Sequence, residues 1–293
     1  MTRHSREDAL TNREFELLLE GAMELPEPQD REARLIILLG GRLGLRPGET
    51  AHLRSEWVDT RAGMITIPRH DPCTFGRNGE ICGYCENQAR REHERYNYEV
   101  SEVLDAIEQS LLDPNATDSD LFDTFVSFVA DKEGNTPIQT LNRIQDRYVD
   151  GDTLDRDAAT ELAVAYVTHH NKPLEEFLEN RWHPKTPNSA RTIPFDFDTR
   201  TEIALERFVD RYDQFPKSRA VVNRRVTDAC EAADEPIDVY PHALRATSAT
   251  YHAARGISVY TLQNLMGWKK IATAEKYIRS SGEATAMELR APK

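Results

Sequence analysis

One histidine and one arginine, three residues apart, constrain the fold more tightly than any other feature of the chain. His242 and Arg245 belong to residues 240–256, a run with apolar positions at helical spacing that ends at Gly256. A glycine after the last periodic residue is a common helix C-cap. Side chains three residues apart on a helix share one face. The sequence therefore predicts a helix that presents an imidazole and a guanidinium together, a pair that suits an anionic group better than a hydrophobic core.

Four further side chains stand in an order that fits one site with this pair. Trp268 follows a short amphipathic helix predicted at residues 257–266, and Tyr277 comes nine residues after Trp268. Upstream, Lys185 precedes a Pro-Asn-Ser turn, and we expect a hairpin there. Arg46 stands in the segment GLRPGETAHL, 139 residues before that lysine. A single site therefore requires a fold that returns the chain to its first helices after a long insertion.

These motifs resemble those of the tyrosine recombinase, or phage integrase, family. The His-x-x-Arg pair corresponds to the family's second box, and Leu-Met-Gly-Trp corresponds to its Leu-Gly-His/Trp turn. The segment GLRPGETAHL corresponds to the first box, GLR-x-x-E-x-x-x-L. The 32 residues from Arg245 to Tyr277 are also the family's usual interval. Several matched positions at matched intervals are more specific than one short motif.

The resemblance implies an enzyme that cuts and rejoins DNA through a 3′-phosphotyrosine. Tyr277 would be the nucleophile that attacks the scissile phosphate and leaves a free 5′-hydroxyl. Arg46 and Arg245 would bind the non-bridging phosphate oxygens with their forked guanidiniums. Lys185 would protonate the leaving 5′-oxygen.

The remaining members of the site would support this chemistry. His242 would act in proton transfer, and Trp268 would donate its indole N–H to the phosphate. Glu49 would orient Arg46 from behind. Because the covalent link conserves the energy of the phosphodiester bond, the resemblance implies no ATP, no cofactor and no metal in catalysis.

Other functions remain open at this point. A type IB-like topoisomerase uses a similar residue set, although the spacing of His242, Trp268 and Tyr277 favours a recombinase. A non-catalytic DNA-binding regulator could retain the fold, but it would not need Tyr277. An interaction scaffold could be built around the acidic middle of the chain. Each residue alone also has an ordinary explanation, such as a solvated arginine or a packed tyrosine, whereas one site explains all six.

The implied fold is mainly helical (α+β): a tyrosine-recombinase catalytic fold with a small antiparallel sheet, interrupted by a zinc-knuckle and helical insert. A strand is predicted at residues 63–68. Helical periodicity marks residues 100–112, 121–129, 154–167 and 174–178. We expect the first part of the catalytic domain at 1–69, the zinc knuckle at 70–98, the acidic helical insert at 99–180 and the second part of the catalytic domain at 181–293.

The predicted knuckle depends on three cysteines. Cys82 and Cys85 form a Cys-x-x-Cys turn after Cys73, and we take His70 as the fourth ligand with His93 as the alternative. A structural zinc ion would give a core to loops rich in Gly and Pro. Reduced thiols without a metal are the competing interpretation.

The net charge of −13 argues against DNA binding at first sight. However, residues 99–180 carry −14, whereas residues 181–293 carry +4. Fifty acidic residues with only 8 lysines against 29 arginines resemble proteins of halophiles, especially haloarchaeal integrases. In molar salt the Debye length falls to about 3 Å, which screens repulsion from DNA.

Partners and location follow from these observations. The resemblance implies double-stranded DNA with specific recombination sites and a homotetramer on DNA, and the acidic insert could dock an accessory protein. No apolar run is long enough to span a membrane, so we expect a cytoplasmic protein. The candidate DNA contacts are Arg54, Arg219, Arg224, Arg225, Lys269 and Lys270.

Overall fold

The computed structural model describes residues 8–103, 105, 118–141, 161, 164–165, 167–179, 182–237 and 239–278. Its contacts divide the chain into two compact units. Unit 1 comprises residues 1–75 and 182–293, and unit 2 comprises residues 76–181. The predicted knuckle and acidic insert thus fall almost entirely within one unit.

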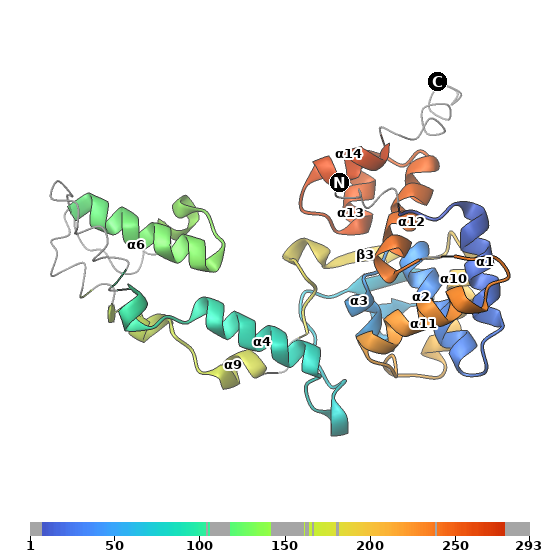
Figure 1. The fold of residues 1–293 in the computed structure, drawn as a ribbon, viewed down its shortest axis with the longest axis horizontal. Helices are drawn as coiled ribbons and strands as arrows, with labels where there is room; N and C mark the ends of the chain where they lie inside the picture. Colours follow the sequence, from blue (N-terminus) through green and yellow to red (C-terminus); the bar gives the residue numbers. More distant parts are fainter. Residues whose placement is uncertain are drawn as a thin grey trace. The chain divides into compact units, whose positions relative to one another are not determined.

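The centre of unit 1 is helix α2 (Gln29–Gly41), whose main contacts are with four longer helices (Figure 1). These are α1 (Asn12–Met23), α10 (Thr199–Val209), α11 (Arg219–Ala232) and α12 (Pro241–Ala254). The five apolar residues at 35–39 are at most 6% exposed, since α2 has neighbours on several sides. Burying each such side chain contributes roughly 1.5–3 kcal/mol, so this run anchors the core.

Local sequence explains how α1 begins and how closely it packs. Thr11 caps the first turn in a capping box with Glu14. Gly21 faces α11, where an added Cβ would lie 2.3 Å from the carbonyl oxygen of Ala229. Glycine therefore allows the two helices to approach at backbone distance.

A three-stranded antiparallel sheet returns the second part of the chain to the first. Its order is β1 (Val58–Asp59), β2 (Met64–Ile67) and β3 (Arg191–Pro194). Ile65 pairs with Ile193, and both are fully buried on one face, whereas Thr66 and Thr192 share the exposed face. The pairing of β2 with β3 places residues 185–194 beside the first-box segment.

The short elements around the sheet differ in part from the expectation. The first box forms α3 (Pro47–Ala51) and the 3-10 turn η1 (Ser55–Trp57), and the Pro-Asn-Ser segment forms the 3-10 turn η3 (Pro187–Ser189). Lys185 lies in a bend before η3 rather than in a strand. The expected lysine hairpin is therefore replaced by a turn that leads into β3, because β3 pairs with β2 instead.

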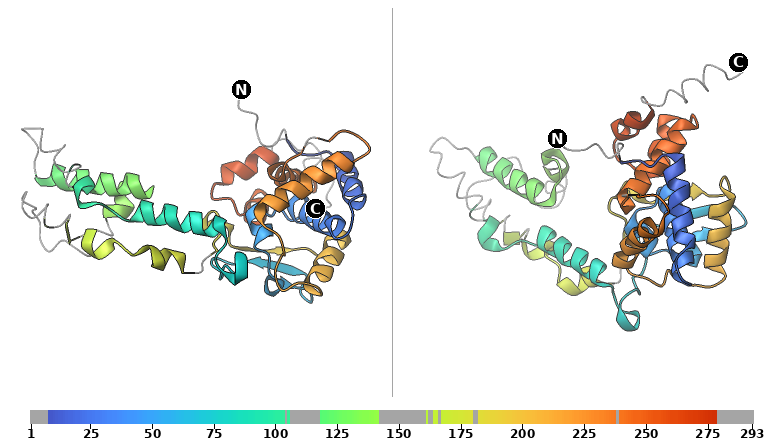
Figure 2. Two further views of the ribbon diagram at one scale, coloured as in Figure 1. Left: turned by 60° about the horizontal axis from the view of Figure 1, so that its bottom comes forward. Right: turned by 45° about the vertical axis from the view of Figure 1, so that its right-hand side comes forward.

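The C-terminal part of unit 1 follows the prediction closely. Helix α12 gives way at Gly256, and α13 (Val259–Met266) and α14 (Ile271–Ile278) pack against it and against each other (Figure 2). Leu262, Met266 and Tyr277 join small residues of α12 and α14 in one apolar cluster. This cluster sets the position of the predicted nucleophile.

Unit 2 is helical in its described parts. It contains the 3-10 turn η2 (Arg77–Gly79) and helices α4 (Gly83–Tyr96), α6 (Asp118–Glu133) and α9 (Leu174–Leu178). Helix α4 packs against α6 and α9. The predicted helices at 100–112 and 154–167 lie largely outside the described residues. Within unit 2, the Glu133 carboxylate is buried and accepts a hydrogen bond of 2.8 Å from the Tyr98 hydroxyl.

The fold class is as predicted: mostly helical with a small antiparallel sheet. In the described part of the chain, none of the helices combines the length and apolar character needed to cross a membrane.

Candidate active site

Arg46 is positioned by the residue that follows it by one helical turn. Its backbone N–H donates to Glu49 Oε2 at 2.9 Å, and its Nη1 donates to Glu49 Oε1 at 2.8 Å. The same Nη1 donates to Ser189 Oγ at 2.8 Å, and Nη2 reaches the Gly267 carbonyl at 3.5 Å. Arg46 is therefore tied both to η3 and to the turn between α13 and α14.

Arg191 on β3 shares the carboxylate of Glu49, which is 2% exposed. Its Nη1 and Nη2 donate to the two carboxylate oxygens at 3.2 and 3.0 Å, and its Nε donates to the Leu265 carbonyl at 2.8 Å. Burial alone would raise the pKa of Glu49, but the charges of Arg191, Arg245 and Arg46 outweigh it and lower the pKa to about 2. Glu49 is thus ionised and holds two guanidiniums in a fixed geometry.

Arg245 on α12 is buried, with an exposure of 3%. Its Nη1 donates to the Gly44 carbonyl, and its Nη2 donates to the Met266 carbonyl. Burial and the positive charges of Arg46 and Arg191 hold the pKa of Arg245 well below its usual range.

The predicted nucleophile lies against the predicted indole donor. Gly267 caps α13 in the left-handed conformation, with φ of 58°, and so turns the chain into Trp268. The Trp268 ring stacks on Tyr277 with centroids 5.3 Å apart, and it lies 5.9 Å from the Arg245 guanidinium carbon. Tyr277 on α14 is 5% exposed.

His242 and Lys185 complete the set at its solvent-exposed side. Partial burial and the positive charges of Arg245, Arg46 and Lys185 lower the pKa of His242. These charges act on His242 because they lie near it. The structure therefore brings all six predicted residues to one place, with charged groups from the first box, the η3 loop and α12.

Two supporting residues have no role in the predictions made from the sequence. Arg191 donates to Glu49, and Ser189 accepts a hydrogen bond from Arg46. The Pro-Asn-Ser segment that contains Ser189 predicts only a turn. Their position before and within β3 becomes meaningful only once β3 pairs with β2. The position of Arg191, six residues after Lys185, is the one feature of the sequence that could have indicated its role.

The candidate DNA contacts separate into two groups. Arg54 is bound to Asp71 at 2.9 Å, and Arg225 is bound to Glu32 at 2.8 Å and to Asp228 at 2.9 Å. Their charges are compensated within the fold, so they are poor candidates for binding phosphate. The candidates that stay solvent-exposed are Arg219, Arg224, Lys269 and Lys270.

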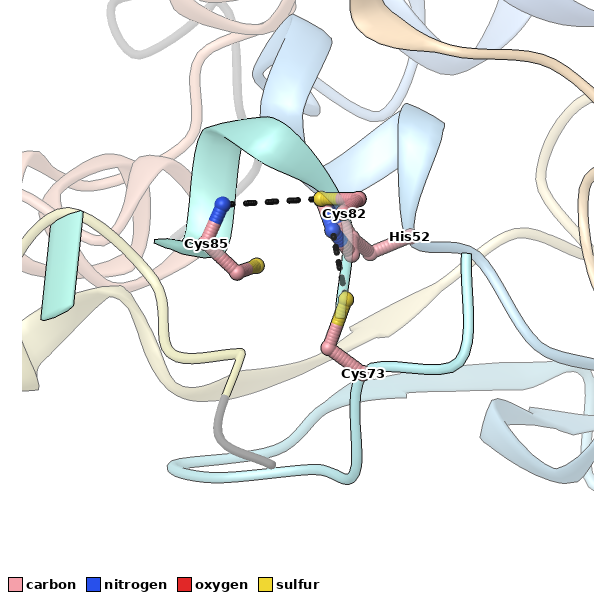
Figure 3. Close-up of side chains that lie close together, drawn as sticks. All are labelled: His52, Cys73, Cys82 and Cys85. Atoms are coloured by element: carbon pink, nitrogen blue, oxygen red, sulfur yellow. Dashed lines mark hydrogen bonds between the residues drawn. The ribbon is translucent and has the colours of Figure 1, made fainter. Parts of the chain in front are cut away.

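The cysteines of the predicted knuckle gather around a different histidine. The ligand atoms of His52, Cys73, Cys82 and Cys85 all lie within 4.8 Å of one another. Figure 3 shows the four side chains grouped together. His70 and His93 are not part of this group. His70 is exposed and its ring lies 6.2 Å from that of His183, whereas the ring of His93 packs edge-on against Phe177.

The geometry defines a class of site before any relative is considered. Two guanidiniums share one buried carboxylate and a third lies near it, beside an imidazole, an amine and a stacked tyrosine. This arrangement suits binding and attack of an anionic ester. Residues 160–283 match the model of the phage integrase family, and this range contains every predicted catalytic residue except Arg46. Over these residues, which make up less than half of the chain, the sequence is similar to the phage integrase family.

Other comparisons add little to this assignment. No curated protein matches the chain significantly. The solved structures similar to it include the Tn1549 transposon integrase in complex with transposon right end DNA, at 16% identity and a TM-score of 0.47 over 97% of this chain and 66% of that one. XerA recombinase has 15% identity and a TM-score of 0.40 over 97% and 65%. The chain spans less than two thirds of these solved chains, and likeness at this level carries no argument about activity.

Proposed function

We propose that the chain is a site-specific DNA recombinase that cuts and rejoins strands through a 3′-phosphotyrosine at Tyr277. The observation that carries the proposal is the gathering of three guanidiniums, those of Arg46, Arg191 and Arg245, near a single buried carboxylate. That carboxylate belongs to Glu49, which pairs with Arg46 and Arg191. A phosphodiester would supply the missing negative charge. The developing charge of the transition state would be stabilised still more strongly.

Both predicted phosphate ligands keep hydrogen-bond donors for such a group. A guanidinium has five N–H donors. Contacts within the described residues use three of them in Arg46 and two in Arg245. The remaining donors of each arginine are enough for a bidentate contact with phosphate oxygens.

The phenolic oxygen of Tyr277 forms a bond to phosphorus while the bond from phosphorus to the 5′-oxygen breaks. The phenolic proton passes to His242, and the leaving 5′-oxygen takes a proton from Lys185. Rejoining is the same step in reverse with a 5′-hydroxyl as nucleophile.

The wider setting belongs to the same proposal. The partners would be two double-stranded recombination sites held by four copies of the chain, in integration, excision or multimer resolution, with the acidic insert open to an accessory protein. The protein would work in the cytoplasm of a salt-accumulating, haloarchaeal-type cell. The chemistry needs no cofactor, and any zinc ion held by the cysteine cluster would be structural.

A suicide-substrate assay tests the chemistry. Nicked duplexes from the attachment region of the host replicon would be incubated with the chain in molar KCl, because cleavage near the nick releases a short fragment and traps the covalent complex. Wild type should give a protein–DNA band that resists denaturant, and Tyr277→Phe should give none. Tyr260→Phe is the matched control, since Tyr260 lies on α13 and is 67% exposed.

The products then separate the alternatives. Exchange of strands between two sites supports a recombinase. Relaxation of supercoils without pairing of sites supports a type IB-like topoisomerase. Bound cognate DNA without any covalent band would overturn the enzymatic proposal in favour of a DNA-binding regulator.

A further inference from the structure

The His–Cys cluster has the donor types of a structural zinc site. Three thiols and one imidazole are a common ligand set for tetrahedral zinc, with Zn–S distances of about 2.3 Å and Zn–N distances of about 2.0–2.1 Å. These values place neighbouring sulfur and nitrogen ligands about 3.6 Å apart. The distance from Cys73 Sγ to His52 Nε2 is 3.7 Å, and all four ligand atoms lie within 4.8 Å of one another (Figure 3).

His52 is held in the tautomer that a metal requires. Its Nδ1 lies 2.9 Å from the Gly48 carbonyl oxygen, which can only accept a hydrogen bond, so Nδ1 carries the proton. Nε2 therefore keeps a lone pair, and this atom faces Cys73. Zinc-binding histidines almost always donate their second ring N–H to a carbonyl or carboxylate in this way.

The fold fixes the orientation of the same ring from both sides. His52 is 3% exposed and stacks on Trp182, with centroids 5.4 Å apart and planes at 22°. The Phe75 ring packs against His52 in a tilted orientation, with ring centroids 4.9 Å apart. The His52 imidazole is a preorganised ligand, because Nδ1 is hydrogen-bonded and the packing of Trp182 and Phe75 fixes the orientation of the ring.

The Cys-x-x-Cys turn is also arranged to hold thiolates. Cys82 is the N-cap of α4, and its Sγ accepts from the backbone N–H of Cys85 at 3.5 Å. Hydrogen bonds to sulfur and the positive end of a helix both favour the ionised thiol that binds metal. Cys73 and Cys85 are buried, and Cys82 is partly exposed.

We propose that His52, Cys73, Cys82 and Cys85 bind one structural zinc ion, with His52 rather than His70 or His93 as the fourth ligand. The ion has a consequence for the first box, because His52 directly follows α3 and is hydrogen-bonded to Gly48 within it. Zinc binding fixes the C-terminal end of the short helix that has Arg46 as its N-cap. The proposal does not depend on the DNA chemistry.

The ligand set is tested on the full-length chain expressed with added zinc. Wild type should contain one zinc ion per chain by plasma mass spectrometry. His52→Gln should bind zinc more weakly than wild type by more than the 10–100-fold typical of a lost supporting contact. His70→Gln, His93→Gln and Cys230→Ser are matched controls that should keep the ion. Loss of zinc in His70→Gln with retention in His52→Gln would overturn the assignment.

Two measurements on the unaltered sequence cover the case in which His52→Gln fails to fold. Cobalt substitution should give the absorption of a tetrahedral site with three thiolates. Zinc chelation should speed amide hydrogen exchange in residues 46–53 while leaving residues 241–254 unchanged. A wild-type chain that binds no zinc, unchanged hydrogen exchange in residues 46–53 on chelation, or a disulfide among the three cysteines would overturn the proposal.

Discussion

Replacing Glu49 by glutamine tests the electrostatic core of the site. The pKa of Glu49 falls from 4.5 to about 2, because the charges of Arg191, Arg245 and Arg46 outweigh its burial. That difference favours the ionised form by about 3 kcal/mol. Glutamine has the shape of the protonated acid, so Glu49→Gln should lower the free energy of unfolding at pH 7 by about 3 kcal/mol. This value agrees with the cost of about 3–5 kcal/mol for removing one partner of a buried ion pair.

The assay is urea unfolding followed by circular dichroism at constant salt. The control is Glu16→Gln, because Glu16 pairs with Arg200 but its side chain is 47% exposed. A surface pair of this kind contributes at most about 1 kcal/mol. A loss in Glu49→Gln no larger than in Glu16→Gln would refute the reasoning.

The pH dependence gives a second check on the same carboxylate. Because the folded pKa of Glu49 is depressed, its contribution is complete above pH 4.5 and is lost as the pH falls from 4.5 to about 2. Wild type should lose stability across this window, and Glu49→Gln should lack that component. An identical slope in both proteins would contradict the assigned role.

Three further predictions concern chemistry, backbone and solvent. Because the pKa of His242 is lowered, its ring is neutral at pH 7, and the rate of covalent-complex formation should fall only below about pH 6.5. His242→Gln should lower the single-turnover rate by about 10²–10⁴-fold and should remove this decline at low pH. Gly267→Ala should lower the free energy of unfolding by at least about 1–2 kcal/mol, because Gly267 has a φ of 58° and a Cβ there would lie 2.9 Å from the Asn188 carbonyl oxygen. The control is Gly48→Ala, which has open space around the added Cβ and should leave the free energy of unfolding unchanged in the same urea assay. The melting temperature should rise between 0.1 and 2 M KCl, since the net charge is −13 and the Debye length shrinks from about 10 Å toward 3 Å; a melting temperature independent of salt would count against the halophilic assignment.

The parts of the site that local sequence encodes could be predicted. The spacing of His242 and Arg245 on one helix face and the glycine turn before Trp268 depend only on neighbours along the chain. Residues 83–96 were expected to belong to loops of a knuckle, but Cys82 caps a helix there, and Glu86 and Arg90 form an ion pair one turn apart. The cysteine pattern led to the prediction of loops, although the charged residues of this segment are spaced as in a helix.

The rest required the tertiary fold. His52 precedes Cys73 by 21 residues, and no ligand spacing links it to the cysteines. Arg225 was a candidate for DNA contact until the fold placed it against Glu32, 193 residues away. A sequence motif does not predict which distant residues will form ion pairs. The ion pair between Arg191 and Glu49 could not be predicted for the same reason.

The most direct test of the central claim is to identify the residue that becomes linked to DNA. The trapped complex from the nicked substrate would be digested with protease and nuclease, and the modified peptide sequenced by mass spectrometry. The account predicts a nucleotide joined through its 3′-phosphate to Tyr277. A link at another residue, or a 5′-phosphate on Tyr277, would contradict it.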